Sequence, residues 1–158
     1  MAGKAFVFNF DALSNSIRES INVLDFLQEK RDLLILVTNQ KSDAFQSCIL
    51  SVLKAGQRFI KVISLDKNKA DIYIKTRERL NACGYSWHGV SNNFERDILS
   101  ALAVGYTGVS ISNEFRGESS VKSWLLISKM TRVRTPTGGC RCFFVKNLSE
   151  IKERYGEL

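Results

Sequence analysis

This sequence predicts an α/β fold of three layers, in which helices cover both faces of a mainly parallel sheet of about five strands. Short apolar runs alternate along the chain with longer segments that have helical periodicity. Connections of that length join parallel strands, whereas an antiparallel pair needs only a short turn. Several of the runs are apolar throughout, which is typical of strands that are buried on both faces.

The first strand, the first helix and the second strand follow from hydrophobic patterns alone. Residues 4–10 are apolar apart from Lys4 and Asn9 and predict a short buried strand. Between residues 14 and 30, apolar side chains recur every three or four positions, which predicts an amphipathic helix. Asp32 then introduces the apolar run 33–37, which predicts the second strand.

The next three elements repeat this order. Residues 42–55 predict a helix that ends at Gly56, because glycine is the commonest residue just after a helix C-terminus. Residues 59–65 predict a third strand, since β-branched side chains recur there. Residues 69–82 predict a helix that Gly84 closes.

The last elements are shorter, and the pattern weakens beyond residue 112. They are a strand at 88–91, a helix at 94–104, a strand at 107–112, a strand at 142–145 and a helix at 149–155. We therefore expect a single domain over residues 1–158, with a regular core at 4–112 and a less regular part at 113–158.

The composition is that of an ordinary globular protein, with 44% hydrophobic and 25% charged residues. No apolar run approaches the roughly 20 residues of a membrane span, so we expect neither a signal peptide nor a membrane anchor. The cysteines lack the spacing of metal ligands, which indicates reduced thiols in a cytoplasmic protein. They are Cys48, Cys83, Cys140 and Cys142.

The formal net charge of +7 favours a partner that carries negative charge. Basic residues are densest between residues 122 and 146, where Arg132, Arg134 and Arg141 surround a loop-like segment rich in glycine and threonine. Such a basic loop fits the phosphates of a nucleic acid or of a phosphorylated protein. The alternative is a solvated surface that keeps the protein soluble.

Polar side chains follow three of the predicted strands. Asn9 and Asp11 follow the first strand, Thr38 and Asn39 the second, and Asn92 the fourth. Ligands of a parallel α/β sheet bind beyond the carboxyl ends of its strands, so these residues predict a pocket. In a simpler alternative, Asp11 and Asn92 are the N-caps of the helices that follow.

Residues 6–11 and 36–40 resemble two motifs of the haloacid dehalogenase (HAD) superfamily, whose members are mostly phosphatases and phosphotransferases. The first motif of that family reads Asp-x-Asp after a strand, and its leading aspartate is the covalent nucleophile. Here that position is Asn9, and an amide cannot form the acyl-phosphate that a carboxylate forms. The resemblance gives Asp11 the place of the general acid/base and Thr38 that of the hydroxyl that binds the phosphoryl group.

Two further motifs are similar to those of the family but incomplete. The lysine of the third motif is Lys67 or Lys69. The fourth motif usually reads Gly-Asp with a second Asp five residues later, and this chain has Asn92 and Asp97 there. Mg²⁺ needs charged oxygen ligands. Since Asp11 and Asp97 are the only carboxylates left, the resemblance implies a degenerate site that binds no metal and no other cofactor.

The resemblance covers about residues 6–112 and implies a Rossmann-like, HAD-like fold. The intervals between its motifs are too short for the cap domains that select small substrates, so a macromolecular partner is favoured. We expect a catalytically inactive binding or regulatory module for a protein or a nucleic acid. Two alternatives stay open: a structural subunit that forms a homo-oligomer, and a residual Mg²⁺-dependent phosphatase that uses Asp11.

Overall fold

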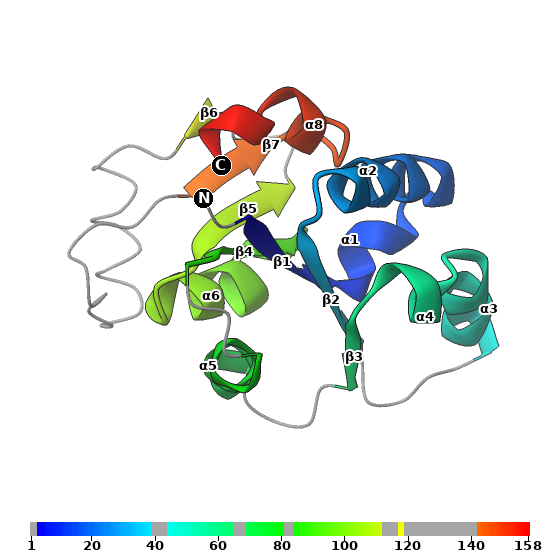
Figure 1. Ribbon diagram of the computed structural model, residues 1–158, viewed down its shortest axis with the longest axis horizontal. Coiled ribbons are helices and arrows are strands. Elements are labelled where there is room, and N and C mark those ends of the chain that lie inside the picture. The colour runs from blue at the N-terminus through cyan, green and yellow to red at the C-terminus, as the bar shows by residue number, and fades with distance from the viewer. Residues whose placement is uncertain (1–2, 39–43, 65–68, 81–83, 112–116, 119–141) are drawn as a thin grey trace.

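The computed structural model of the chain describes residues 3–38, 44–64, 69–80, 84–111, 117–118 and 142–158. Within these ranges the strands form one sheet (Figure 1). They are β1 (Lys4–Asn9), β2 (Leu33–Thr38), β3 (Lys61–Ser64), β4 (Ser86–Ser91), β5 (Thr107–Ile111), β6 (Gly117–Glu118) and β7 (Cys142–Val145).

The spatial order of the strands is β3-β2-β1-β4-β5-β7-β6. All neighbouring strands are parallel except β6, which pairs antiparallel with β7. The predicted α/β fold with a mainly parallel sheet is therefore confirmed. The sheet is wider than about five strands because β7 continues it in parallel and β6, which the sequence did not predict, adds a short antiparallel edge.

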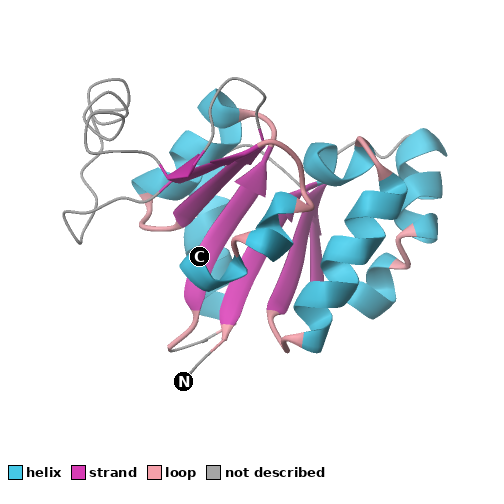
Figure 2. Cartoon of the chain, turned by 90° about the horizontal axis from the view of Figure 1, so that it is seen from above, coloured by secondary structure: helices cyan, strands magenta, loops and turns pink. Residues whose placement is uncertain are grey.

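The helices lie on both faces of the sheet (Figure 2). They are α1 (Phe10–Ser14), α2 (Ile17–Glu29), α3 (Ala44–Val52), α4 (Ala55–Arg58), α5 (Lys69–Arg79), α6 (Leu99–Ala103) and α8 (Glu150–Glu153), with a π-helical turn η1 (Phe94–Ile98) and a 3₁₀ turn η2 (Tyr155–Glu157). On the described part of the chain, no helix is long and apolar enough to cross a membrane.

Two hydrophobic layers hold the helices on the sheet. On one face, α1, α2, α3 and α8 share a hydrophobic cluster with apolar residues of β1, β2, β4, β5 and β7, and Leu24, Leu27 and Ile151 are fully buried in it. On the other face, α5 and α6 pack over the central strands, with Tyr73 and Ala101 in the core. Burial of apolar surface on both faces is the main stabilising contribution to a sheet of this type.

Gly89 allows α6 to come close to the middle of β4. A Cβ atom placed on Gly89 would lie 2.8 Å from the Cβ of Ala101 on that helix. No side chain fits at that distance without a shift of the helix, so a glycine is required at this point of the strand.

Several predicted boundaries are wrong. Gly56 lies inside α4, and it is Lys54 that has a positive φ (50°) between α3 and α4. The predicted helix at 14–30 begins only at Ile17, because Ser16 is its N-cap, and the separate helix α1 precedes it directly after β1. The predicted helix at 94–104 is divided into the π-helical turn η1 and the α-helix α6.

Candidate functional site

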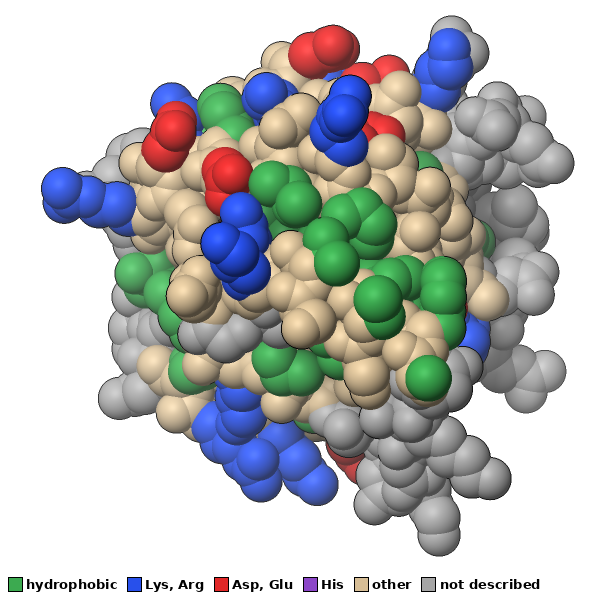
Figure 3. Space-filling view, turned by 90° about the vertical axis from the view of Figure 1, so that its right-hand side faces the viewer, with side chains coloured by type: hydrophobic (Ala, Val, Ile, Leu, Met, Phe, Trp, Pro, Cys, Tyr) green, Lys and Arg blue, Asp and Glu red, His purple; other side chains and the backbone are tan. Residues whose placement is uncertain are grey.

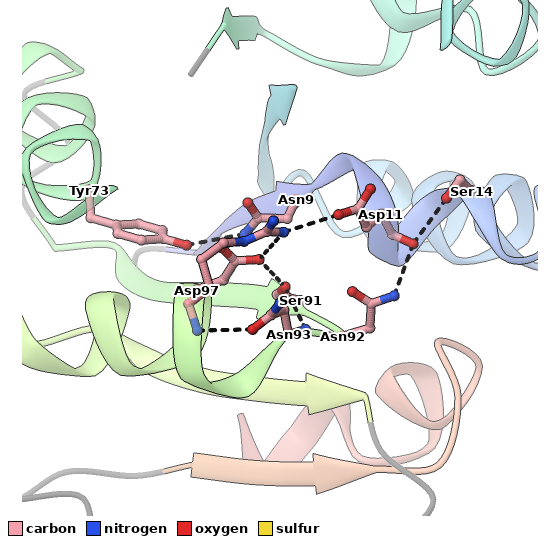
Figure 4. Close-up of polar contacts among 9 residues, drawn as sticks. Asn9, Asp11, Ser14, Tyr73, Ser91, Asn92, Asn93 and Asp97 are labelled. Atoms are coloured by element: carbon pink, nitrogen blue, oxygen red, sulfur yellow. Dashed lines mark hydrogen bonds and ion pairs between the residues drawn. The ribbon is translucent and has the colours of Figure 1, made fainter. Parts of the chain in front are cut away.

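The carboxyl ends of β1, β2 and β4 lie side by side. Strand β1 is central, with Asn9 opposite Val37 of β2 and Phe8 opposite Val90 of β4. The sheet therefore brings the ends of these strands to one edge. Figure 4 shows Asn9, Asp11, Ser91, Asn92 and Asp97 grouped at this edge.

Asn9 is buried, and its amide is held by a residue of helix α5. Its Nδ2 donates a hydrogen bond to the hydroxyl of Tyr73 on α5, at 3.2 Å (Figure 4). Burial raises the pKa of Tyr73 to about 12, so this hydroxyl stays protonated at neutral pH. Tyr106 donates a hydrogen bond of 2.6 Å to the backbone carbonyl of Tyr73 and so helps to hold α5 in place. The side chain of Asn9 is thus positioned by a buried contact of its own.

Arg96 lies between the two carboxylates of the site. Its Nη2 is 3.1 Å from Oδ2 of Asp11 and 3.3 Å from Oδ2 of Asp97, and its Nε is 3.0 Å from Oδ1 of Asp97. The Asp97 side chain is fully buried, whereas those of Arg96 and Asp11 are 46% and 41% exposed. A guanidinium that binds two carboxylates through three bonds makes a geometrically defined, charge-assisted contact.

The loop after β4 fixes the position of Asp97. Ser91 Oγ donates to Oδ2 of Asp97 at 2.5 Å and accepts from the backbone N–H of Asn93 at 3.0 Å. Asn93 Oδ1 accepts from the backbone N–H of Arg96 at 2.9 Å, so Asn93 is the N-cap of η1. The alternative that Asn92 caps this helix is wrong. Its Nδ2 donates instead to the backbone carbonyl of Asp11, at 3.3 Å.

Asp11 is not an N-cap either. It lies in the first turn of α1, where Asn9 holds the N-cap position without a capping bond from its side chain. Its carboxylate therefore faces Arg96, at the edge of the sheet, and serves the site rather than the start of the helix.

Thr38 is buried at the end of β2, next to the strand that carries Asn9. The other predicted site residues fall outside the described ranges, and so does nearly all of the basic stretch between residues 122 and 146. The predicted residues that lie outside are Asn39, Lys67, Arg132, Arg134 and Arg141, and of Lys69 only the backbone is described.

Sequence reasoning missed Arg96 and Tyr73. Arg96 precedes a motif aspartate, and in a sequence a basic residue beside an acidic one is read as a solvated surface pair. Tyr73 occupies an apolar helix position and is read as a core residue, which it also is. Both act on partners far away in the sequence, at Asp11 and Asn9. The one signal for Arg96 was its position beside Asp97 in the fourth motif.

The described side chains do not fit a divalent cation. No cluster of three or more His, Cys, Asp or Glu side chains that could hold a metal occurs in the described ranges. Mg²⁺ requires several charged or strongly polar oxygen ligands. The oxygens of Asp11 and Asp97 that face the site already accept hydrogen bonds from Arg96.

Comparison with known proteins relates the chain to others through its fold. No protein-family model matches it, and no curated protein matches it by sequence. An uncharacterized protein from Listeria monocytogenes serotype 4b has a similar structure, with a TM-score of 0.66 and 12% sequence identity over 98% of this chain and 97% of that one. A 2-haloacid dehalogenase from Pseudomonas syringae pv. Tomato DC3000 has a TM-score of 0.57 and 15% identity over 88% of this chain and 52% of that one.

At these identities the similarity establishes the fold alone. The chain has the Rossmann-like α/β fold of HAD-like proteins, as its motifs led us to expect, and it spans about half the length of the dehalogenase.

Proposed function

We propose that this chain of HAD-like fold is a catalytically inactive binding module. The observation that carries the proposal is the position of Arg96, whose guanidinium lies within hydrogen-bond distance of both Asp11 and Asp97. The resemblance to the HAD family would require a dication among these same carboxylates. An internal cation that is covalently part of the chain removes the need for that dication.

Asn9 supports the same conclusion. It stands where the resemblance expects the nucleophilic aspartate, and an amide has no lone pair of comparable reactivity to attack a phosphorus atom. Its Nδ2 donates a hydrogen bond to the buried hydroxyl of Tyr73. The residue therefore has a structural role that an aspartate could not fill in the same way, since a carboxylate is not a donor.

Arg96 also limits what Asp11 can do. A general acid/base must exchange a proton with a reacting group, and for that it must be free to approach it. The Asp11 carboxylate instead accepts a hydrogen bond from Arg96, and the Asp11 backbone carbonyl accepts one each from Asn92 and from Ser14. These contacts fix α1 to the loop after β4 and favour a rigid surface over a reactive one.

The partner we propose is a macromolecule. Only α1 and α2 lie between β1 and β2, so no cap domain encloses the site on that side. About half of the Arg96 side chain is exposed, so it is open to a large partner. The net charge of +7 favours a partner with negative charge, and Arg132, Arg134 and Arg141 are proposed to contact it.

The test compares the wild-type protein with Arg96→Gln in a thermal-shift titration with Mg²⁺, together with a hydrolysis assay on p-nitrophenyl phosphate. We expect Mg²⁺ to leave the wild-type Tm unchanged and to raise that of Arg96→Gln, because the variant has two carboxylates without a cation. We expect no hydrolysis by either protein, since both have Asn9. A matched control is Arg96→Gln with Asp97→Asn, which should lose the response to Mg²⁺. Mg²⁺-dependent hydrolysis by the wild-type protein that Asp11→Asn abolishes would overturn the proposal.

A further inference from the structure

Strand β3 forms one edge of the sheet. It pairs with β2 alone, so one side of its backbone has no neighbouring strand among the described residues. The backbone N–H of Ile60, just before the strand, donates to the carbonyl of Leu34 in β2 at 2.9 Å. Leu34 and Leu36 thus face β3, and the register pairs Ile35 with Lys61 and Leu36 with Val62. In a parallel ladder with this register, Lys61 and Ile63 bond to β2, and Val62 directs its N–H and C=O groups to the free edge.

On the α3 side of this edge the surface is apolar. Phe45, Val52, Ile60 and Val62 are the large hydrophobic side chains most exposed in the described part of the chain, at 44% to 65%. Phe45 and Val52 lie seven residues apart on α3, which carries no charged residue. Hydrophobic side chains gather on this face of the molecule in Figure 3. An apolar strip beside an open strand is a surface that a partner can cover.

On the α5 side the same edge is basic. A small hollow of about 60 Å³ lies between β3 and α5 and is lined by Lys61, Ile63, Ile72, Lys75, Thr76 and Arg79. None of its three basic side chains forms an ion pair with another described residue. The hollow therefore combines aliphatic side-chain stems with positive charges that can accept an acidic group.

We propose that the free edge of β3 binds an extended segment of a partner protein in which acidic and apolar residues alternate. A strand added to a sheet places successive side chains on opposite faces. One set would then contact the apolar strip beside α3, and the other would place carboxylates against Lys61, Lys75 and Arg79. The segment's backbone would bond to the N–H and C=O groups of Val62.

The basic charge and the open backbone of the β3 edge disfavour two other partners, a second copy of the chain and a nucleic acid. A second copy of the chain would bring its own Lys61 and a further net charge of +7 to a surface that is already basic. A nucleic acid has phosphates for the basic hollow, but it supplies no strand of N–H and C=O groups for the edge. The inference concerns a different face of the molecule from the Arg96 site and does not depend on that site being inactive.

The probe is a fluorescein-labelled, end-capped peptide of alternating valine and glutamate, about eight residues long. Its control has the same composition with all valines before all glutamates. Fluorescence anisotropy should show tighter binding of the alternating peptide. Lys75→Glu should weaken that binding about tenfold, whereas Lys152→Glu, the same charge change on α8, should leave it within about twofold. Lys75 and Lys152 are both exposed, so neither variant threatens the fold.

Amide hydrogen exchange then tests the geometry. The peptide should slow exchange at Val62, while Lys61 and Ile63, whose N–H groups already face β2, should change little. Equal affinity for the two peptides would overturn the proposal, and so would binding without protection at Val62. A doubled molecular mass with the Val62 amide protected before peptide is added would also overturn it, because a second copy would then occupy the edge. The Mg²⁺ titration of Arg96→Gln is independent of every one of these outcomes.

Discussion

Replacement of Arg96 by glutamine removes a positive charge from a site with two carboxylates and keeps a polar side chain in its place. Asp97 loses bonds of 3.0 and 3.3 Å and keeps the hydrogen bond from Ser91. Removal of one partner from a fully buried ion pair costs about 3 to 5 kcal/mol. Here Asp97 is fully buried but Arg96 is 46% exposed, so water reaches the guanidinium and part of this effect is lost.

We expect Arg96→Gln to lower the free energy of unfolding by about 2 to 3 kcal/mol. The half-exposed contact with Asp11 adds less than about 1 kcal/mol to the effect. The measurement is urea denaturation near neutral pH, with a chelator present so that no metal replaces the lost charge. A fall of that size changes the folded-to-unfolded ratio by one to two orders of magnitude, well within the resolution of the method.

A second substitution shows whether the unpaired, buried carboxylate of Asp97 causes the loss of stability in Arg96→Gln. Asp97→Asn added to Arg96→Gln should restore part of the lost stability, because a neutral amide needs no cation. A loss below about 0.5 kcal/mol in Arg96→Gln would refute the reasoning, since that is the usual effect of a solvated surface residue. No recovery in the double variant would show that the guanidinium acts through its packing instead.

Three further predictions concern the core. Burial lowers the pKa of His88 to about 4, below the unfolded value of about 6.5, so acid protonates the unfolded chain first. Between about pH 7 and pH 5, this difference should lower the free energy of unfolding of the wild-type protein by about 2 kcal/mol. In paired urea titrations over the same range, the loss of stability in His88→Asn should be smaller by that amount. Gly89→Ala should destabilise by about 1 to 3 kcal/mol in thermal denaturation, because its Cβ meets Ala101; an unchanged Tm would contradict the close packing of α6. Tyr73→Phe should cost about 1 kcal/mol in urea denaturation by removing the acceptor for Asn9, and added Asn9→Ala should then cost less than it does alone.

The sequence was sufficient for the parallel strands of the sheet but not for the antiparallel β6. Runs such as 33–37 are apolar at every position, and only a strand buried on both faces needs that pattern. Helix ends were harder to place, because local rules compete. Glycine is the preferred residue for a positive φ, yet Lys54 takes that conformation and Gly56 is helical. The neighbouring packing therefore decided between two nearby positions, and composition alone does not carry that information.

The candidate site, like the fold, could be predicted only in part. That polar residues gather beyond the carboxyl ends of β1, β2 and β4 was predicted from a parallel sheet, which the alternation of strands and helices indicates. That Arg96 reaches Asp11, 85 positions earlier, does not follow. It depends on the π-helical turn η1, where Asn93 caps the backbone N–H of Arg96, and nothing in the pattern at 94–104 separates a π turn from an α-helix.

The central position of β1 has a consequence for synthesis of the chain. Its first neighbour, β2, leaves the ribosome soon after it, but its other neighbour is β4, where Lys4 pairs with Ser86. Until β4 is made, β1 presents an uncovered apolar edge, which is a template for wrong pairing with other chains. A nascent chain that stops before residue 86 should therefore need chaperone protection, and slow translation of this stretch should lower the yield of soluble protein more than slow translation after β5.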